Sequence, residues 1–422
     1  MREMKDSGIG WVHDIPITWN TIKGKYIFKN KKQVVGANVD NFERLALTLN
    51  GVIKRSKDDN EGLQPDKFNT YQILRKNELV FKLIDLQNIS TSRVGLSQYT
   101  GIVSPAYIIL KANKGIHPAF AEKYYLMMWM NQVFNALGDS GVRSSLNSNE
   151  LLEISAPLPT IEEQKLIAEF LDKKCGEIDG LISNIEKEIE VLIQYKKSII
   201  TETVTKGFNK DIKLKSSKIS WIPEIPDYWE VSKIKYNLSR KTVRNPGNAT
   251  VLSLYREYGI VPKDSRDDNH NVTSEDTSKY LFVKKGQFVI NKMKAWQGSM
   301  AISKYEGIVS PAYYVYDFIS NNLCKEYLHY LLKNPSYIEE FRRLSGGIRE
   351  GQWDLPAEEF ENLLILIPPI QEQREIAEYL DKKCKEIDSI LEDKNKQLEI
   401  LESYKKSIIY EYVTGKKEVV DD

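Results

Sequence analysis

A segment of 45 residues occurs twice in this chain, and this duplication constrains the fold more than any other feature. Residues 161–205 align without gaps to residues 370–414, with 26 identities in 45 positions at a constant offset of 209. Neither copy contains proline, and apolar residues recur in both at steps of three and four, the spacing typical of paired helices. The sequence therefore predicts two similar long helices.

The residues before each copy also repeat, more loosely. WVHDIPITW (11–19) matches WIPEIPDYW (221–229), and GIVSPAY occurs at both 101–107 and 307–313. The order is thus a globular segment, a helix, a second globular segment and a second helix. We expect a first globular domain at 1–159, a first helical spacer at 160–210, a second globular domain at 211–368, a second spacer at 369–416 and a tail at 417–422.

A long helix is stable only when its apolar stripe is covered, and the obvious cover for one copy is the other. Because the ends of a domain usually lie close together, the second domain should return the chain so that the helices are antiparallel and the two halves are related by a pseudo-twofold axis. Two helices packed separately on their own domains are the alternative. The predicted seam consists of Ile178, Ile182, Ile185, Ile189, Leu192, Ile199, Ile387, Leu391, Leu398, Leu401 and Ile408.

The globular segments have a different pattern, which predicts mixed α/β (α+β) domains. Short apolar stretches at 78–84, 101–110, 286–290 and 307–316 have strand character, and 121–134 and 325–344 have helical character. A 45-residue helix spans roughly 65 to 70 Å, the length of about 20 base pairs of B-DNA. Two similar domains on such a spacer would suit a split target read in two inverted halves.

Composition excludes several protein classes. No run of about 18 apolar residues exists and the first ten residues lack a signal-peptide core, so we expect a soluble, cytoplasmic protein. Cys175, Cys324 and Cys384 are too scattered for a disulfide framework or a zinc site. The net charge of the chain is +1, but it is unevenly distributed: residues 1–159 carry +5, residues 160–210 carry −2, residues 211–368 carry +2 and residues 369–422 carry −4. The globular segments are therefore mildly basic and the helices mildly acidic.

Enzyme signatures are missing from the sequence. There is no phosphate-binding GxxxxGK[ST] loop, no GxGxxG after a strand, and no metal-ligand spacing among the four histidines. We therefore predict no catalytic, cofactor-binding or metal-binding residue, and a protein that is not an enzyme.

The chain resembles the specificity subunit of type I restriction-modification systems over essentially its whole length. The resemblance rests on the helix entries PTIEEQKLIAEFL and PIQEQREIAEYL, on the WIPEIPDYW opening, and on the repeated domain-helix order. It implies two target-recognition domains that each read one half of a bipartite double-stranded DNA sequence, while the helices set the spacing and dock two modification subunits. S-adenosylmethionine, ATP and Mg would then belong to partner subunits, which include the restriction and translocation subunit.

Base and phosphate contacts need Arg, Lys, Asn, Gln, hydroxyl and aromatic side chains on loops. In each domain three loop-like stretches carry such side chains. The residues of these stretches differ between the two copies, whereas the segments around them are similar. The candidates in the first domain are Lys54, Arg55, Gln87, Asn88, Arg93, Arg143, Ser144 and Ser145. Those in the second are Ser253, Tyr255, Arg256, Lys292, Lys294, Trp296, Gln297, Arg349, Gln352 and Trp353.

Two other functions remain open on sequence grounds. The chain could be a coiled-coil adaptor that displays two interaction domains without binding DNA, or a self-contained nuclease or methyltransferase with unrecognised motifs. The DNA target and its spacer length cannot be derived, because base preference depends on loop geometry and DNA shape. GIVSPAY consists mostly of packing residues, and we interpret it as scaffold rather than as a site.

Overall fold

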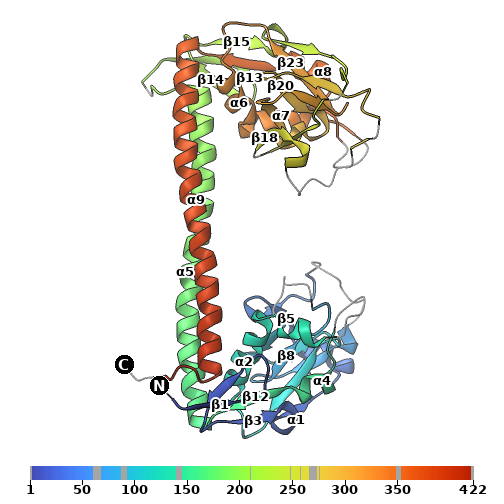
Figure 1. The fold of residues 1–422 in the computed structure, drawn as a ribbon, viewed down its shortest axis with the longest axis vertical. Coiled ribbons are helices and arrows are strands. Elements are labelled where there is room, and N and C mark those ends of the chain that lie inside the picture. Colours follow the sequence, from blue (N-terminus) through green and yellow to red (C-terminus); the bar gives the residue numbers. More distant parts are fainter. Residues whose placement is uncertain are drawn as a thin grey trace. The chain divides into compact units, whose positions relative to one another are not determined.

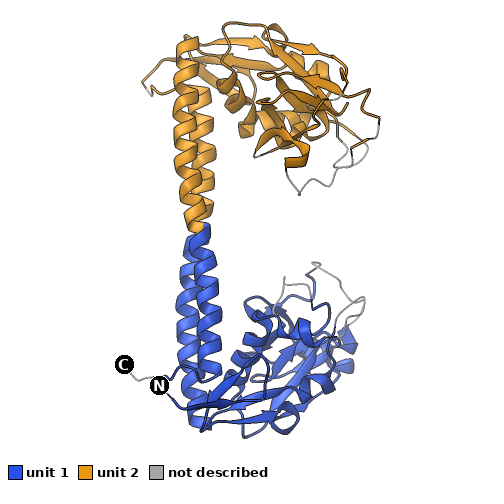
Figure 2. Cartoon of the chain, in the orientation of Figure 1, with its two compact units in different colours: residues 1–186, 395–422 blue, residues 187–394 orange. Residues whose placement is uncertain are grey.

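The chain is described by a computed structural model that covers residues 2–59, 68–86, 93–138, 145–209, 211–247, 249–256, 258–265, 273–274, 276–347 and 353–419. It divides into a first unit, residues 1–186 with 395–422, and a second unit, residues 187–394 (Figure 1, Figure 2). Each long helix, α5 (Ile161–Lys206) and α9 (Ile370–Val413), contributes to both units. None of the helices in the described ranges is long and apolar enough to cross a membrane.

Within the first unit the two helices run antiparallel. Lys405 of α9 pairs with Asp179 of α5 at 2.5 Å. Closer to the start of α5, the ring centres of Phe170 and Tyr412 lie 4.4 Å apart. Residue numbers therefore rise along α9 as they fall along α5, which is the mark of an antiparallel pair. This confirms the antiparallel pairing predicted from the duplication.

The second unit shows the same direction of pairing. Lys394 pairs with Glu188 at 2.5 Å, and Lys196 pairs with Asp388 at 2.5 Å. The Lys196 pair is the repeat equivalent of the pair between Lys405 and Asp179, since both members shift by 209 positions.

These ion pairs explain why Lys196 and Lys405 occupy positions where the apolar pattern asks for isoleucine or leucine. Each lysine side chain is mostly covered, with 28% and 19% exposure, and its ammonium meets a more exposed aspartate on the other helix. Ion pairs of this kind add little stability, but a polar seam position fixes the register of a helix pair. Among the predicted seam residues Ile178, Ile387 and Ile408 are buried and the others are half-buried.

In the first unit the globular part contains two four-stranded sheets. One has the order β6-β5-β10-β7, in which β10 pairs parallel with β5, and the other has the order β4-β11-β8-β9. Two short antiparallel pairs, β1 with β2 and β12 with β3, complete the strands. The bounds are β1 Met4–Asp6, β2 Asp14–Pro16, β3 Asn20–Lys23, β4 Phe28–Asn30, β5 Arg44–Thr48, β6 Gly51–Arg55, β7 Gln72–Leu74, β8 Leu79–Phe81, β9 Val94–Leu96, β10 Gly101–Val103, β11 Ile108–Ala112 and β12 Ser155–Leu158.

The helices of this part are α1 (Gly24–Ile27), α2 (Pro118–Met130), α3 (Val133–Leu137) and α4 (Ser148–Glu153). Buried residues of α2, such as Tyr124 and Tyr125, share one core with Trp19 and with the first turns of α5. The same core includes Ile408, Ile409 and Val413 from the far end of α9. The first domain is therefore incomplete without the last turns of the second helix.

The second unit has a related but more divided sheet structure. A four-stranded sheet has the order β16-β23-β20-β21, and the pairs β13-β14, β15-β24, β17-β18 and β19-β22 surround it. The bounds are β13 Leu214–Ile219, β14 Ile222–Pro226, β15 Glu230–Lys233, β16 Leu238–Lys241, β17 Leu252–Tyr255, β18 Gly259–Pro262, β19 Leu281–Val283, β20 Phe288–Asn291, β21 Met300–Ile302, β22 Gly307–Val309, β23 Tyr313–Phe318 and β24 Leu364–Ile367.

Its core joins α6 (Lys325–Lys333), α7 (Pro335–Leu344) and α8 (Ala357–Asn362) to the start of α9, and it includes the fully buried Val204 from the end of α5. The mixed α/β class predicted for both domains is confirmed. The helical character predicted over 325–344 is confirmed as two helices: Pro335 starts the second, which the Asn334 side chain caps by accepting from the Ser336 amide at 2.8 Å.

A tryptophan attaches each globular domain to the first turn of its long helix. Trp19 Nε1 donates to Glu163 at 2.9 Å, and Trp229 Nε1 donates to Glu372 at 3.1 Å. Both indoles are buried. These pairs explain why the tryptophans and the glutamate at the third position of each helix copy, Glu163 and Glu372, recur.

The glutamine that follows this glutamate is also used identically. Gln164 accepts the amide of His117 at 2.7 Å and donates to the Pro159 carbonyl at 3.0 Å. Gln373 accepts the amide of Cys324 at 2.8 Å and donates to the Pro368 carbonyl at 2.8 Å. Each buried amide therefore ties the domain to the approach of its helix.

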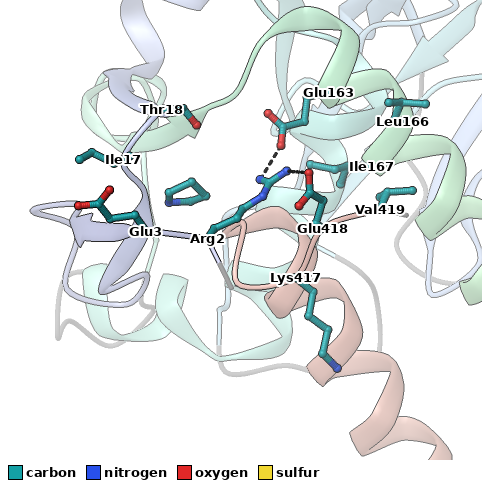
Figure 3. A pocket seen from close by; sticks show the side chains of 11 residues that line it. Arg2, Glu3, Ile17, Thr18, Glu163, Leu166, Ile167, Lys417, Glu418 and Val419 are labelled. Carbon is teal, nitrogen blue, oxygen red and sulfur yellow. Dashed lines mark hydrogen bonds and ion pairs between the residues drawn. The ribbon is translucent and has the colours of Figure 1, made fainter. Parts of the chain in front are cut away.

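Both ends of the described chain lie at the start of α5 within the first unit. The Arg2 guanidinium pairs with Glu163 at 2.6 Å and with Glu418 at 2.8 Å, at the edge of a hollow of about 460 Å³ (Figure 3). Lys416 donates to the carbonyls of Val12 and Asp14. The segment after α9 thus packs against the first strands.

The repeated GIVSPAY motif forms a buried strand followed by a tight turn. Its glycine is required by close packing: a Cβ on Gly101 would lie 2.5 Å from the Glu43 carbonyl oxygen, and one on Gly307 would lie 2.3 Å from that of Thr250. In the turn, Ser104 Oγ and Ser310 Oγ each accept an amide two residues later at 3.3 Å. Packing and turn geometry therefore account for the recurrence.

We predict that Gly101→Ala and Gly307→Ala each destabilise the chain by about 1–3 kcal/mol, because the added methyl group meets backbone oxygen that cannot move aside. Urea unfolding would measure this effect. Gly10→Ala is the control, since nothing lies within 4 Å of a Cβ there and its stability should be unchanged within about 0.5 kcal/mol. Equal stability of all three variants would contradict the packing explanation.

Candidate nucleic-acid interface

The β5–β6 hairpin of the first unit presents two of the predicted contact residues. Lys54 Nζ pairs with Glu43 at 2.7 Å and lies 5.3 Å from the centre of the Tyr99 ring. Arg55 Nε pairs with Asp59 at 2.6 Å. The hydrogen bond that the Lys54 ammonium donates to the Glu43 carboxylate raises the pKa of Lys54, so the ammonium stays charged. Both cations would have to exchange a carboxylate for a phosphate when binding DNA.

Arg93 requires a correction. Its side chain is buried, with 1% exposure, and its guanidinium donates to the carbonyl of Ile84 at 3.2 Å and to that of Asp85. A buried guanidinium that holds loop carbonyls has a structural role and is not presented to DNA. Ser145 is exposed and forms an antiparallel bridge with Ile84, so this loop and the segment before α4 lie together.

Six of the predicted contact residues lie outside the described residues. They are Gln87, Asn88, Arg143, Ser144, Arg349 and Gln352.

In the second unit the segment after β20 folds into a short 3-10 helix, η5 (Lys292–Gln297), that carries four predicted contact residues. The Asn291 side chain caps it by accepting the Met293 amide at 3.1 Å, and Gly298 ends it with a φ of 78°. Lys292 Nζ pairs with Asp354 at 3.2 Å, and Lys294 is exposed. The cap therefore fixes the direction in which the lysines emerge.

Three separate predicted segments meet around η5. The Arg256 guanidinium, at the end of β17, donates to the Gln297 side chain at 2.9 Å. The rings of Trp296 and Trp353 lie 5.4 Å apart, and the Arg342 guanidinium lies 6.0 Å from the centre of the Trp353 ring. Ser253 and Tyr255 lie on β17 and are half-buried. The structure thus brings four of the second-domain candidates into one polar and aromatic cluster: Arg256, Trp296, Gln297 and Trp353.

The frame of this cluster repeats in the first unit. The Leu146 amide donates to the Leu83 carbonyl at 3.0 Å, and the Leu355 amide donates to the Lys292 carbonyl at 3.0 Å, with both members shifted by 209 positions. The same backbone contact therefore joins the same two segments in each domain, while the side chains around it differ.

Sequence reasoning missed residues that shape the second cluster. Asn291 was overlooked although it stands immediately before the predicted lysines, at a strand end where Asn favours a cap. Arg342 and Asp354 were overlooked because one lies within a helix and the other reads as a surface charge. Across the described ranges, His, Cys, Asp and Glu side chains nowhere gather in threes that could hold a metal ion.

Comparison with known proteins identifies one family. Its model, described as the type I restriction modification DNA specificity domain, matches residues 16–191 and 226–400. The putative type I restriction enzyme MjaX specificity subunit of Methanocaldococcus jannaschii is 29% identical over 73% of this chain and 70% of its own length. The MjaVIII specificity subunit of the same organism is 32% identical over 62% of this chain and 62% of its own length.

Solved structures share the fold. A chain from a study of complex assembly and conformational transition of the type I R-M system matches with a TM-score of 0.68 and 12% identity, covering 96% of this chain and 99% of its own. The HsdS subunit from Thermoanaerobacter tengcongensis matches with a TM-score of 0.50 and 14% identity, covering 96% and 98%.

Proposed function

Because the chain belongs to the family of the type I restriction modification DNA specificity domain, we propose that it is the DNA-recognition subunit of a type I restriction-modification complex. Each unit would read one half of a bipartite duplex target. The resemblance noted from the duplicated helix motif is thereby confirmed at the level of the family, and a DNA-free adaptor is not favoured.

The observation that carries this proposal is the convergence of three variable segments on a repeated frame. Around η5 the side chains of Arg256, Gln297 and Trp353 come from three segments that differ between the copies, while the backbone contact beneath them is the same. Arg, Gln and aromatic side chains are the groups that read base edges and stack on sugars or bases. A repeated scaffold with different side chains suits two unlike half-sites.

Adenine methylation mapped across a genome tests this function. Cells that express this chain with its modification subunit should methylate one bipartite sequence, and cells with the modification subunit alone should not. Methylation that is absent, or that occurs at a continuous site without a spacer, would contradict the proposal.

We further propose that the long helices dock two copies of the modification subunit. Exposed apolar side chains recur at equivalent helix positions: Leu181 and Ile390 (52% and 44% exposed), Val191 and Ile400 (both 66%), and Tyr195 and Tyr404 (52% and 53%). The first unit thus carries Leu181, Ile400 and Tyr404, and the second carries Ile390, Val191 and Tyr195. Large apolar residues exposed at matching positions support two equal contacts with one kind of partner.

Charge substitutions in these two patches should change the composition of the complex stepwise. We expect Tyr195→Glu or Tyr404→Glu to leave one modification subunit per chain and the double variant to leave none, because a carboxylate in an apolar contact loses its water. Light scattering coupled to size exclusion measures the masses.

The matched control is the double variant with Tyr195→Phe and Tyr404→Phe, which keeps the apolar contact and should assemble fully. Full assembly of the double glutamate variant would show that the partner docks elsewhere.

The remaining roles follow from the division of labour proposed for the complex. The helices, each continuous through both units, would set the spacing between the half-sites. S-adenosylmethionine would bind to the modification subunits, and ATP and Mg to the restriction subunit, in the cytoplasm where the DNA lies.

A further inference from the structure

A hollow of about 400 Å³ lies beside η5 in the second unit, and each polar side chain in its described lining can donate a hydrogen bond. Among the described residues that line it none is aspartate or glutamate. The polar side chains include two lysines, an amide and several hydroxyls. They come from β17, the segment after β18, described residues before β19, the end of β20, η5 and the turn that leads into β23. Chief among them are Lys263, Lys294, Asn291, Ser253, Ser310 and Tyr313.

The backbone holds these donors in place from several directions. The Lys292 amide donates to the Ala312 carbonyl at 3.0 Å, which joins η5 to the turn of the GIVSPAY motif. The Lys263 amide donates to the Val251 carbonyl at 2.8 Å, and the Lys263 ammonium contacts the Thr273 hydroxyl. The lining is therefore assembled before any ligand arrives, which reduces the entropy lost on binding.

The corresponding hairpin in the first unit borders a hollow of a different character. That hollow, about 510 Å³, is lined by Lys54 and Arg55 but also by Glu43 and Asp58. Lys54 already pairs there with Glu43 at 2.7 Å. Carboxylates therefore line the first-unit hollow beside its cations, whereas the described lining of the second-unit hollow contains lysines and no carboxylate.

We propose that the hollow of the second unit binds a phosphodiester group of the DNA backbone. Phosphate oxygens only accept hydrogen bonds, so they match a lining of ammonium, amide and hydroxyl donors. Apolar side chains, among them those of Leu252 and Met293, also line the hollow. This inference rests on the proposed function and names one contact within it.

The contact gives the repeated motif a second role. Ser310 and Tyr313 belong to GIVSPAY, which we interpreted from sequence as scaffold alone. In the structure the turn also forms one wall of the hollow, so it would hold one phosphate at a fixed distance from the variable side chains of η5. A phosphate contact carries no base preference but sets the register of the domain on the duplex.

Salt dependence of binding by the complete complex with the modification subunit tests the site. We expect Lys294→Gln to lower the slope of log affinity against log salt by about one, since one fewer counterion is released per lost phosphate contact. The loss of affinity should be the same factor for a target duplex and an unrelated duplex. Fluorescence anisotropy with labelled duplexes between low and moderate KCl gives both quantities.

Lys304→Gln is the matched control, because this exposed lysine lies in the same domain outside the hollow and the first repeat has Gln98 at the equivalent position. Its slope should equal that of the unaltered chain. A slope for Lys294→Gln equal to that of the control would overturn the phosphate site while leaving DNA recognition intact. Failure of the unaltered complex to bind any duplex would instead contradict the proposed function.

Free phosphate is the other source of the same chemistry. If inorganic phosphate raised the melting temperature of the unaltered chain but not that of Lys294→Gln, and the salt slopes agreed, the hollow would be a site for the free anion and the proposal would be wrong. No melting shift together with a lowered slope supports the DNA contact.

Discussion

The antiparallel pairing of α5 and α9 is the constraint on which the rest of the structure depends. Each globular core is closed by the last turns of the helix that belongs to the other repeat: Ile408, Ile409 and Val413 enter the first core, and Val204 enters the second. Because these side chains are nearly or fully buried, losing the helix ends would leave apolar surface exposed in both domains. Helix pairing and the stability of the two domains therefore depend on each other in this chain.

The same dependence explains which parts of the repeat are identical. The tryptophan, glutamate and glutamine at the helix entry, the lysine and aspartate of the seam, and the glycine of GIVSPAY each make a contact with exact geometric demands. The side chains around η5 and its counterpart carry no such demand from packing, and they differ. The two repeats thus share one backbone frame, and the side chains on that frame have diverged into two different surfaces.

Much of this arrangement could be predicted from sequence because the duplication aligns equivalent positions. Periodicity located the helices, and connectivity gave their direction. Apolar spacing alone does not show the break between α6 and α7, because it continues across Asn334 and Pro335, where a cap restarts the helix. Arg93 was misassigned because a loop arginine reads as exposed, whereas its burial depends on carbonyls that only the folded chain brings near.

The convergence of Arg256, Gln297 and Trp353 also depended on tertiary structure, since these residues are 41 and 56 positions apart. Composition indicated suitable side chains but could not say which would meet. The second role of GIVSPAY was not accessible from sequence for the same reason, because the hollow that its turn borders is built from several segments that are distant in the chain.

The central claim is that each unit reads its own half-site on a shared frame. The most direct test replaces residues 229–367 with residues 19–158, joining equivalent positions from the tryptophan to the end of the last strand before the helix. Adenine methylation is then mapped in cells with the modification subunit. The account predicts a target whose two halves are the same sequence in inverted orientation. An unchanged asymmetric target would contradict it.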